Sequence, residues 1–153
     1  MEKIINGIKY RLDEGNETAE VIKKRGYKGE VIIPDTVELK KVGVYRVTSI
    51  GESAFEGCSL LSDITIPASV TSIGVQMFDG CSSLKSITIP DSVTSIGDWA
   101  FSECSSLTSI TIPNSVTIIG DYAFYYCTSL TSVTLSDSVT SIGFYAFISC
   151  PIK

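Results

Sequence analysis

Apolar residues recur along most of this chain at a spacing of 23 residues. One phenylalanine column consists of Phe55, Phe78, Phe101, Phe124 and Phe147. A cysteine column follows it by three residues and consists of Cys58, Cys81, Cys104, Cys127 and Cys150. A fixed period of this length predicts a solenoid, in which each unit buries its apolar face against its neighbours.

Each unit divides into three short segments, as in residues 107–129. The stretch "SITIP" alternates apolar and polar residues and predicts a strand that Pro113 ends. A second extended segment, Val116 to Gly120, closes with a glycine that we expect to take a positive φ. The equivalent glycines are Gly51, Gly74, Gly97, Gly120 and Gly143. The segment from Asp121 to Cys127 is too short for an α-helix and predicts a helical turn or loop.

The full pattern, L-x-x-I-x-I-P-x-x-V-x-x-I-G-x-x-A-F-x-x-C-x-x, resembles the Treponema-type leucine-rich repeat of BspA-like bacterial surface proteins. The resemblance runs from Val31 to Cys150, with Met77 in place of the alanine and Ser136 in place of the proline. It implies a leucine-rich-repeat solenoid that is mostly β. The expected parallel sheet lies on the concave face, with short or helical turns on the convex side and a β-hairpin cap at the N-terminus.

The two ends of the chain differ from the repeats. Residues 1–30 lie outside the period, and Asn6-Gly7 between apolar residues predicts a hairpin in an N-terminal β cap. Residues 31–60 form the first repeat, with a hairpin insertion at about 38–48 and a turn near Lys41–Gly43. Residues 61–153 form four repeats without a clear C-terminal cap. We therefore expect end-to-end self-association through the last repeat.

Charge is unevenly distributed and limits the choice of partner. The net charge is −5, and residues 61–153 hold seven acidic residues against two basic ones, Lys85 and Lys153. Binding to nucleic acid or to an anionic membrane is therefore disfavoured. No apolar run is long enough to span a membrane, and no apolar segment typical of a signal peptide follows Met1. Either the protein stays in the cytoplasm, or the export signal lies outside this sequence.

The sequence offers little catalytic or metal-binding chemistry. Its 153 residues include no histidine, so Ser-His and Cys-His pairs are excluded. The cysteines lack the paired spacing of zinc ligands, and we expect a buried, reduced column rather than disulfides. Asp98 and Asp121 occupy equivalent positions that could hold calcium, although solvated turn residues explain them better. We predict no cofactor, no metal site and no enzymatic activity.

Two groups of residues are candidates for binding. Outward positions of the main strand form a column of Thr65, Thr88, Thr111 and Thr134. Threonine also suits strands on its own account, so this column could be structural. The aromatic candidates are Trp99, Tyr122, Tyr145, Tyr125 and Tyr126. Aromatic residues are enriched at binding hot spots, but the first three could equally pack on one another as a ladder.

The resemblance implies a non-enzymatic adhesion or protein-interaction module of a surface or secreted protein. Some BspA-like proteins bind matrix or plasma proteins such as fibronectin and fibrinogen, so the expected partner is a host or bacterial protein. Two alternatives stay open. One is a structural spacer that binds nothing, and the other is a glycan-binding module with exposed aromatic rings that are coplanar with a groove. Fold alone does not decide among these functions.

Overall fold

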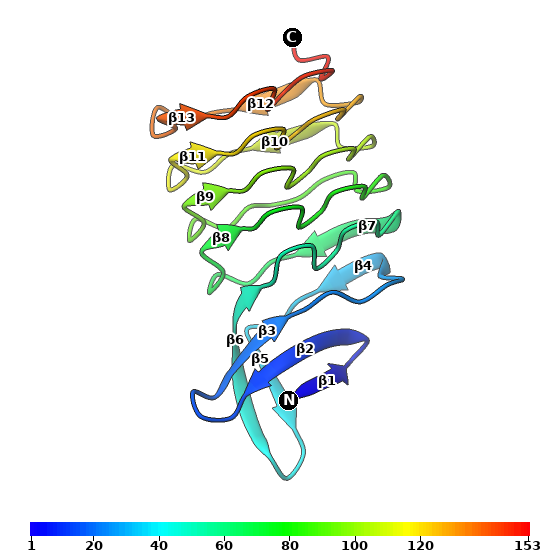
Figure 1. Ribbon diagram of the computed structural model, residues 1–153, viewed down its shortest axis with the longest axis vertical. Helices are drawn as coiled ribbons and strands as arrows, with labels where there is room; N and C mark the ends of the chain where they lie inside the picture. The colour runs from blue at the N-terminus through cyan, green and yellow to red at the C-terminus, as the bar shows by residue number, and fades with distance from the viewer.

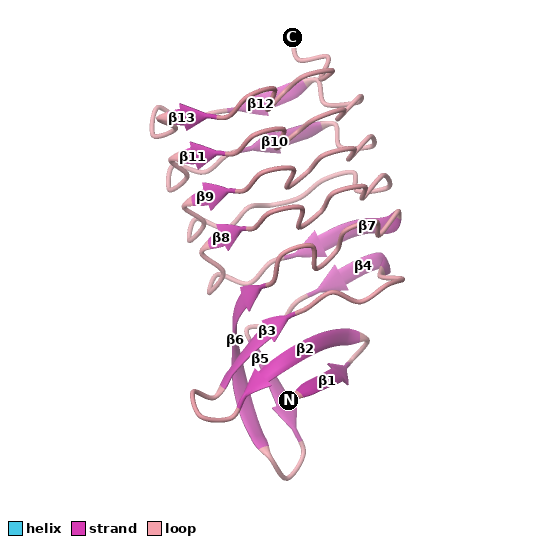
Figure 2. Cartoon of the chain, in the orientation of Figure 1, coloured by secondary structure: helices cyan, strands magenta, loops and turns pink.

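Successive segments of the chain lie on top of one another. A computed structural model describes all 153 residues. Figure 1 shows coils stacked from the N-terminal sheet at the bottom to the C-terminus at the top. All regular elements are strands, and the structure contains no helix (Figure 2). The predicted mostly-β solenoid is therefore confirmed.

Five strands form a sheet at the N-terminal end, in the order β1-β2-β3-β6-β5. Their bounds are β1 (Glu2–Ile5), β2 (Ile8–Asp13), β3 (Thr18–Val21), β5 (Thr36–Leu39) and β6 (Gly43–Ile50). The first hairpin has Asn6 and Gly7 at its turn with φ of 48° and 83°, as the sequence predicts. The second joins β5 to β6, with Leu39 opposite Gly43. Strand β3 pairs with β6 in parallel, so the first hairpin is attached to the start of the stack.

Parallel pairs of main strands form the concave face. Strand β4 (Lys28–Ile32) pairs with β7 (Leu60–Thr65), and β10 (Ser109–Thr111) pairs with β12 (Ser132–Thr134). Residues 85–89 lie between these pairs and are not part of a strand, although the Lys85 amide donates to the Ser62 carbonyl at 3.3 Å. A second parallel sheet runs along the side of the stack. Its strands are β8 (Ser72–Ile73), β9 (Ser95–Ile96), β11 (Ile118–Ile119) and β13 (Ser141–Ile142).

The convex side consists of consecutive turns. One left-handed position recurs in every coil, at Ser53, Gln76, Trp99, Tyr122 and Tyr145. A second recurs at Gly57, Gly80, Glu103, Tyr126 and Ser149. Only two of these ten residues are glycine, the residue that takes this conformation most easily. The residue types at these positions therefore do not reveal the left-handed turns that recur in every coil.

The prediction that the 23-residue glycine column takes positive φ is wrong, because none of its members lies in that region. Close approach between coils explains the glycines at positions 97, 120 and 143 instead. A Cβ on Gly120 would lie 2.4 Å from the Asp98 Oδ1 and 2.6 Å from the Asp98 amide nitrogen. A Cβ on Gly97 would lie 2.8 Å from the backbone of Gly74. Side chains at these positions would push the coils apart.

The phenylalanine column is the centre of the core. Neighbouring rings stack with centroid distances of 5.5, 5.3, 5.1 and 5.0 Å, from the Phe55–Phe78 pair to the Phe124–Phe147 pair. The first four rings are fully buried, whereas Phe147 is half-buried. At the N-terminal end, the Tyr27 ring lies 4.7 Å from that of Phe55. The repeated columns therefore do stack as the period predicts.

Each cysteine thiol after the first donates a hydrogen bond to a phenylalanine carbonyl of the preceding coil. The Cys104 Sγ lies 3.2 Å from the Phe78 oxygen, and the Cys127 Sγ lies 3.1 Å from the Phe101 oxygen. Burial raises the pKa of the Cys81 and Cys104 thiols, which therefore stay protonated and able to donate at neutral pH. All five are free thiols, but the expected burial holds for only four, because Cys150 is partly exposed at the end of the stack.

Candidate interaction surfaces

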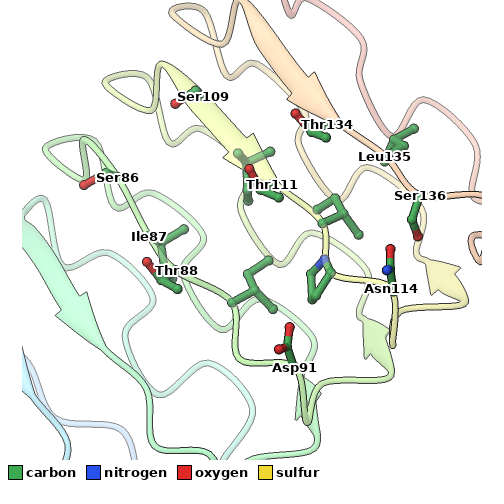
Figure 3. A pocket seen from close by; sticks show the side chains of 14 residues that line it. Ser86, Ile87, Thr88, Asp91, Ser109, Thr111, Asn114, Thr134, Leu135 and Ser136 are labelled. Carbon is green, nitrogen blue, oxygen red and sulfur yellow. The ribbon is translucent and has the colours of Figure 1, made fainter.

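The main strands line a shallow groove of about 680 Å³ on the concave face. In Figure 3, Thr88, Thr111 and Thr134 come from successive coils, with Asp91 and Asn114 at the turns that follow the strands. Ser86 and Thr88 also line a neighbouring groove that reaches Thr65. The four candidate threonines are therefore brought together on one surface that extends over four coils.

The groove is almost uncharged. Asp91 is the only ionisable residue among those that line it, and the rest are hydroxyl, amide or aliphatic. Leu135, with 42% of its surface exposed, adds an apolar contact at one end. No nucleophile is paired with a base here. The groove can exchange several hydrogen bonds with a ligand, but it offers no deep cavity for a small molecule.

Hydrogen bonding separates this threonine column from others in the chain. Thr94, Thr117 and Thr140 each come directly before a strand of the side sheet, and their hydroxyls donate to carbonyls of the preceding coil at 3.2, 3.4 and 3.3 Å. The hydroxyls of the concave column have no partner within the protein. Its members are Thr65, Thr88, Thr111 and Thr134, and all four are exposed. The hydroxyls beside the side sheet thus form hydrogen bonds between coils, whereas the hydroxyls of the concave column remain free to bind a partner.

The aromatic candidates lie on the convex side, on a different surface. The rings of Trp99 and Tyr122 stack at 4.2 Å with an interplanar angle of 10°, and Tyr145 continues the column at 5.5 Å. Tyr125 lies with its ring edge-on to Trp99 and Tyr122, at 5.6 Å from each. The rings of Trp99 and Tyr122 cover one another's faces, whereas Tyr145 is 59% exposed at the end of the column.

Asp98 and Asp121 connect the coils. The Asp98 Oδ1 accepts a hydrogen bond from the Asp121 amide at 2.8 Å, and the Asp121 Oδ1 accepts one from the Phe144 amide at 2.7 Å. The structure contains no group of three potential metal ligands. These carboxylates have a structural role that the sequence analysis missed. The sequence feature that could have predicted this role is the Gly-Asp pair, which occurs in two successive units as Gly97-Asp98 and Gly120-Asp121.

Nearby, burial raises the pKa of Asp79 on the convex side. The Gln76 Nε2 donates to the Asp79 Oδ2 at 3.5 Å. The exposed Glu103 raises the pKa further by like-charge repulsion. Acidic groups therefore lie close together on this side of the repeats.

Residues 46–153 match the BspA type leucine rich repeat region in six copies. The chain belongs to the BspA-type leucine-rich-repeat family. Known structures show the same fold in several bacterial proteins. The T. pallidum leucine-rich-repeat protein is similar at 31% identity and a TM-score of 0.83, over 99% of this chain and 69% of that one. A search of curated protein sequences found no significant match.

Two further similar structures have names that give a location or a use. A leucine rich cell surface protein from Faecalibacterium prausnitzii A2-165 is 30% identical, with a TM-score of 0.69, and this chain covers 53% of it. All of this chain is aligned in that comparison. The pneumococcal vaccine antigen PcpA is 28% identical, with a TM-score of 0.75, over 98% of this chain and 42% of that one. Our chain contains no helix of the length and hydropathy needed to cross a membrane.

Proposed function

We propose that this chain is a protein-interaction module of a bacterial surface or secreted protein, and that it binds a host or bacterial protein through the concave groove. The unpartnered threonine column carries the proposal. An exposed array of hydroxyls that the fold does not use is available to the main chain and polar side chains of a partner. The neighbours named as a cell surface protein and a vaccine antigen support an exposed location.

The groove suits a broad and hydrogen-bonding contact. It is open, spans several coils and contains a single charge, Asp91, so binding depends little on long-range attraction. Aliphatic residues at its edge, such as Leu135, provide the apolar contact that protein interfaces need. A spacer function would need neither the groove nor its free hydroxyls. The absence of enzymatic activity remains part of the proposal.

Biolayer interferometry with immobilised fibrinogen and fibronectin tests this proposal. We expect Thr111→Arg, which fills the groove, to weaken binding at least tenfold. Thr117→Arg adds the same charge beside the side sheet and serves as the matched control. Circular dichroism and thermal unfolding of each variant show whether the fold is retained.

The outcomes separate the functions. Loss of binding with Thr111→Arg alone supports the concave surface. Equal loss with both arginine variants would assign the binding to another part of the chain. A chain that binds neither protein, when folded and in excess, would favour a spacer.

A further inference from the structure

A second surface lies on the convex side and differs from the groove in chemistry. It combines the aromatic residues Trp99, Tyr122, Tyr125 and Tyr126 with the carboxylates of Asp98, Glu103 and Asp121. We call this set the acidic aromatic patch. Ring contacts link its aromatic members, since Tyr125 lies 5.6 Å from both Trp99 and Tyr122 and 4.6 Å from Tyr126.

The carboxylates are next to these rings along the chain or across one coil. Asp98 and Asp121 each precede a stacked ring in the sequence, and one oxygen of each is used by a backbone amide. Glu103 lies one coil below Tyr126, and its amide donates to the Tyr125 carbonyl at 2.7 Å. Glu103 is exposed and has no ion-pair partner. Glu103 is therefore next to the Tyr125–Tyr126 pair of the following coil, and Asp98 and Asp121 are adjacent in sequence to the stacked rings.

Folding alone does not account for the aromatic residues here. Trp99, Tyr122 and Tyr126 have φ of 58°, 55° and 55°, a region that bulky side chains disfavour. At the same turn positions, earlier coils have Gln76 and Gly80. Mutual stacking stabilises the first two rings, but Tyr126 is 48% exposed. A residue that is costly in this conformation and also solvent-exposed indicates a role beyond packing.

The charge of the patch is not neutralised within the protein. All four ion pairs of the structure involve acids at or before Glu56. No lysine or arginine occurs between Lys85 and Lys153. Aromatic faces and unpaired carboxylates both attract cations, and arginine binds each of them well.

We infer that the acidic aromatic patch binds an arginine- or lysine-rich segment of a partner polypeptide. A guanidinium group contacts the exposed face of Tyr126 while it pairs with the Glu103 carboxylate. Further cations pair with the free oxygens of Asp98 and Asp121. This surface is separate from the concave groove, so the two can be occupied at the same time.

Trp99 provides the measurement, because it is the only tryptophan of the chain. Its emission is followed while the intact chain is titrated with nona-arginine, and in parallel with nona-glutamate. We expect a saturable change with nona-arginine alone. The affinity should fall at least fivefold between 50 and 300 mM NaCl, because salt screens attraction between exposed charges. The Debye length is about 10 Å at 0.1 M salt and shortens as salt is added.

Three variants distinguish the patch from general attraction by a net charge of −5. Glu103→Gln and Tyr126→Ser should each weaken binding at least threefold, and the serine is the residue found at the equivalent position 149. Asp91→Asn removes one charge from the opposite face and should change the affinity less than twofold. Equal effects of Glu103→Gln and Asp91→Asn would overturn the inference, as would binding of nona-glutamate. A salt-independent change with cellohexaose in place of nona-arginine would assign the patch to glycans instead.

Discussion

The two ends of the solenoid hold the same type of coil in opposite surroundings. At the N-terminal end, Tyr27 covers Phe55, and a five-stranded sheet closes the stack. At the other end, Phe147 is half-buried, while Phe144 and Ile142 are 78% and 49% exposed. Ile142 shares its repeat position with Ile119, which is only 1% exposed, so one position is core in one coil and surface in another. Burial in this molecule is a property of neighbours rather than of the residue itself.

Backbone hydrogen bonding shows the same difference. The amides of Tyr122, Phe124 and Tyr126 each donate to a carbonyl of the last coil, at distances from 2.7 to 3.1 Å. The equivalent amides of the last coil have no acceptor in the chain. They belong to Tyr145, Phe147 and Ser149. We therefore expect the stability of equivalent positions to fall toward the C-terminal end.

The largest expected effect is at the phenylalanine column. Phe101→Ala removes a fully buried ring between two stacked neighbours and should lower the free energy of unfolding by about 3–5 kcal/mol. Phe147→Ala should cost less than half as much, because that ring has one neighbour and is half-buried. Urea unfolding followed by circular dichroism measures both. Equal losses would contradict the difference between the ends.

The glycine column should show an effect of intermediate size. Gly120→Ala places a Cβ against the Asp98 backbone and should cost about 1–3 kcal/mol, typical of overpacking. Gly74→Ala is the matched control, since its Cβ would lie 3.7 Å from the nearest atom, the Met77 terminal carbon. We expect that control to change thermal stability little. A large loss at Gly74 would mean that conformation, rather than space between coils, decides this column.

The second left-handed position provides a smaller test. Glu103→Gly should stabilise the protein by about 1 kcal/mol, since an L-residue at φ of 56° carries a penalty that glycine lacks. Gly80→Ala, at φ of 72°, should have the opposite effect by a similar amount. Differential scanning calorimetry resolves changes of this size. If both substitutions lower the melting temperature, Glu103 makes a stabilising contact that outweighs its backbone strain.

Self-association is the weakest expected effect. The last coil presents Ile142, Phe144 and Ile148, and Asp137 and Lys153 are the only charges after Thr131. The N-terminal sheet covers the other end, so we expect any contact between two copies of this chain to form between their C-terminal faces. Sedimentation velocity at increasing protein concentration should show a mixture of monomer and dimer, without larger assemblies. Phe144→Asp should leave only monomer, and larger assemblies would argue for a different contact.

The period of 23 residues was sufficient to predict which side chains stack. It predicted the buried columns and a second extended segment in each unit, because equivalent residues in a solenoid must be neighbours, but it did not predict that these segments pair into a second sheet. It could not predict which atoms approach. Glycine at position 120 is required by the Asp98 carboxylate of the coil below, and that contact appears only when two coils are placed together.

The candidate surfaces were only partly predictable for a related reason. Thr111 and Thr117 both belong to threonine columns with the same spacing, and both are exposed. Their difference is that the Thr117 hydroxyl lies 3.4 Å from the Thr94 carbonyl oxygen. Likewise, the sequence grouped the aromatic residues by position but could not determine whether their rings face solvent or each other. Orientation depends on the left-handed turns, and residues such as Trp99 do not signal them.

The reactivity of the cysteine thiols can be used to measure how often each coil opens locally. A thiol that donates to a buried carbonyl cannot react with an alkylating reagent until its coil separates from the one before it. Cys150 is partly exposed, whereas Cys104 is fully buried in the middle of the stack. Timed alkylation with mass spectrometry would therefore give one opening rate for each coil, from the C-terminal coil to the coil beside the N-terminal sheet.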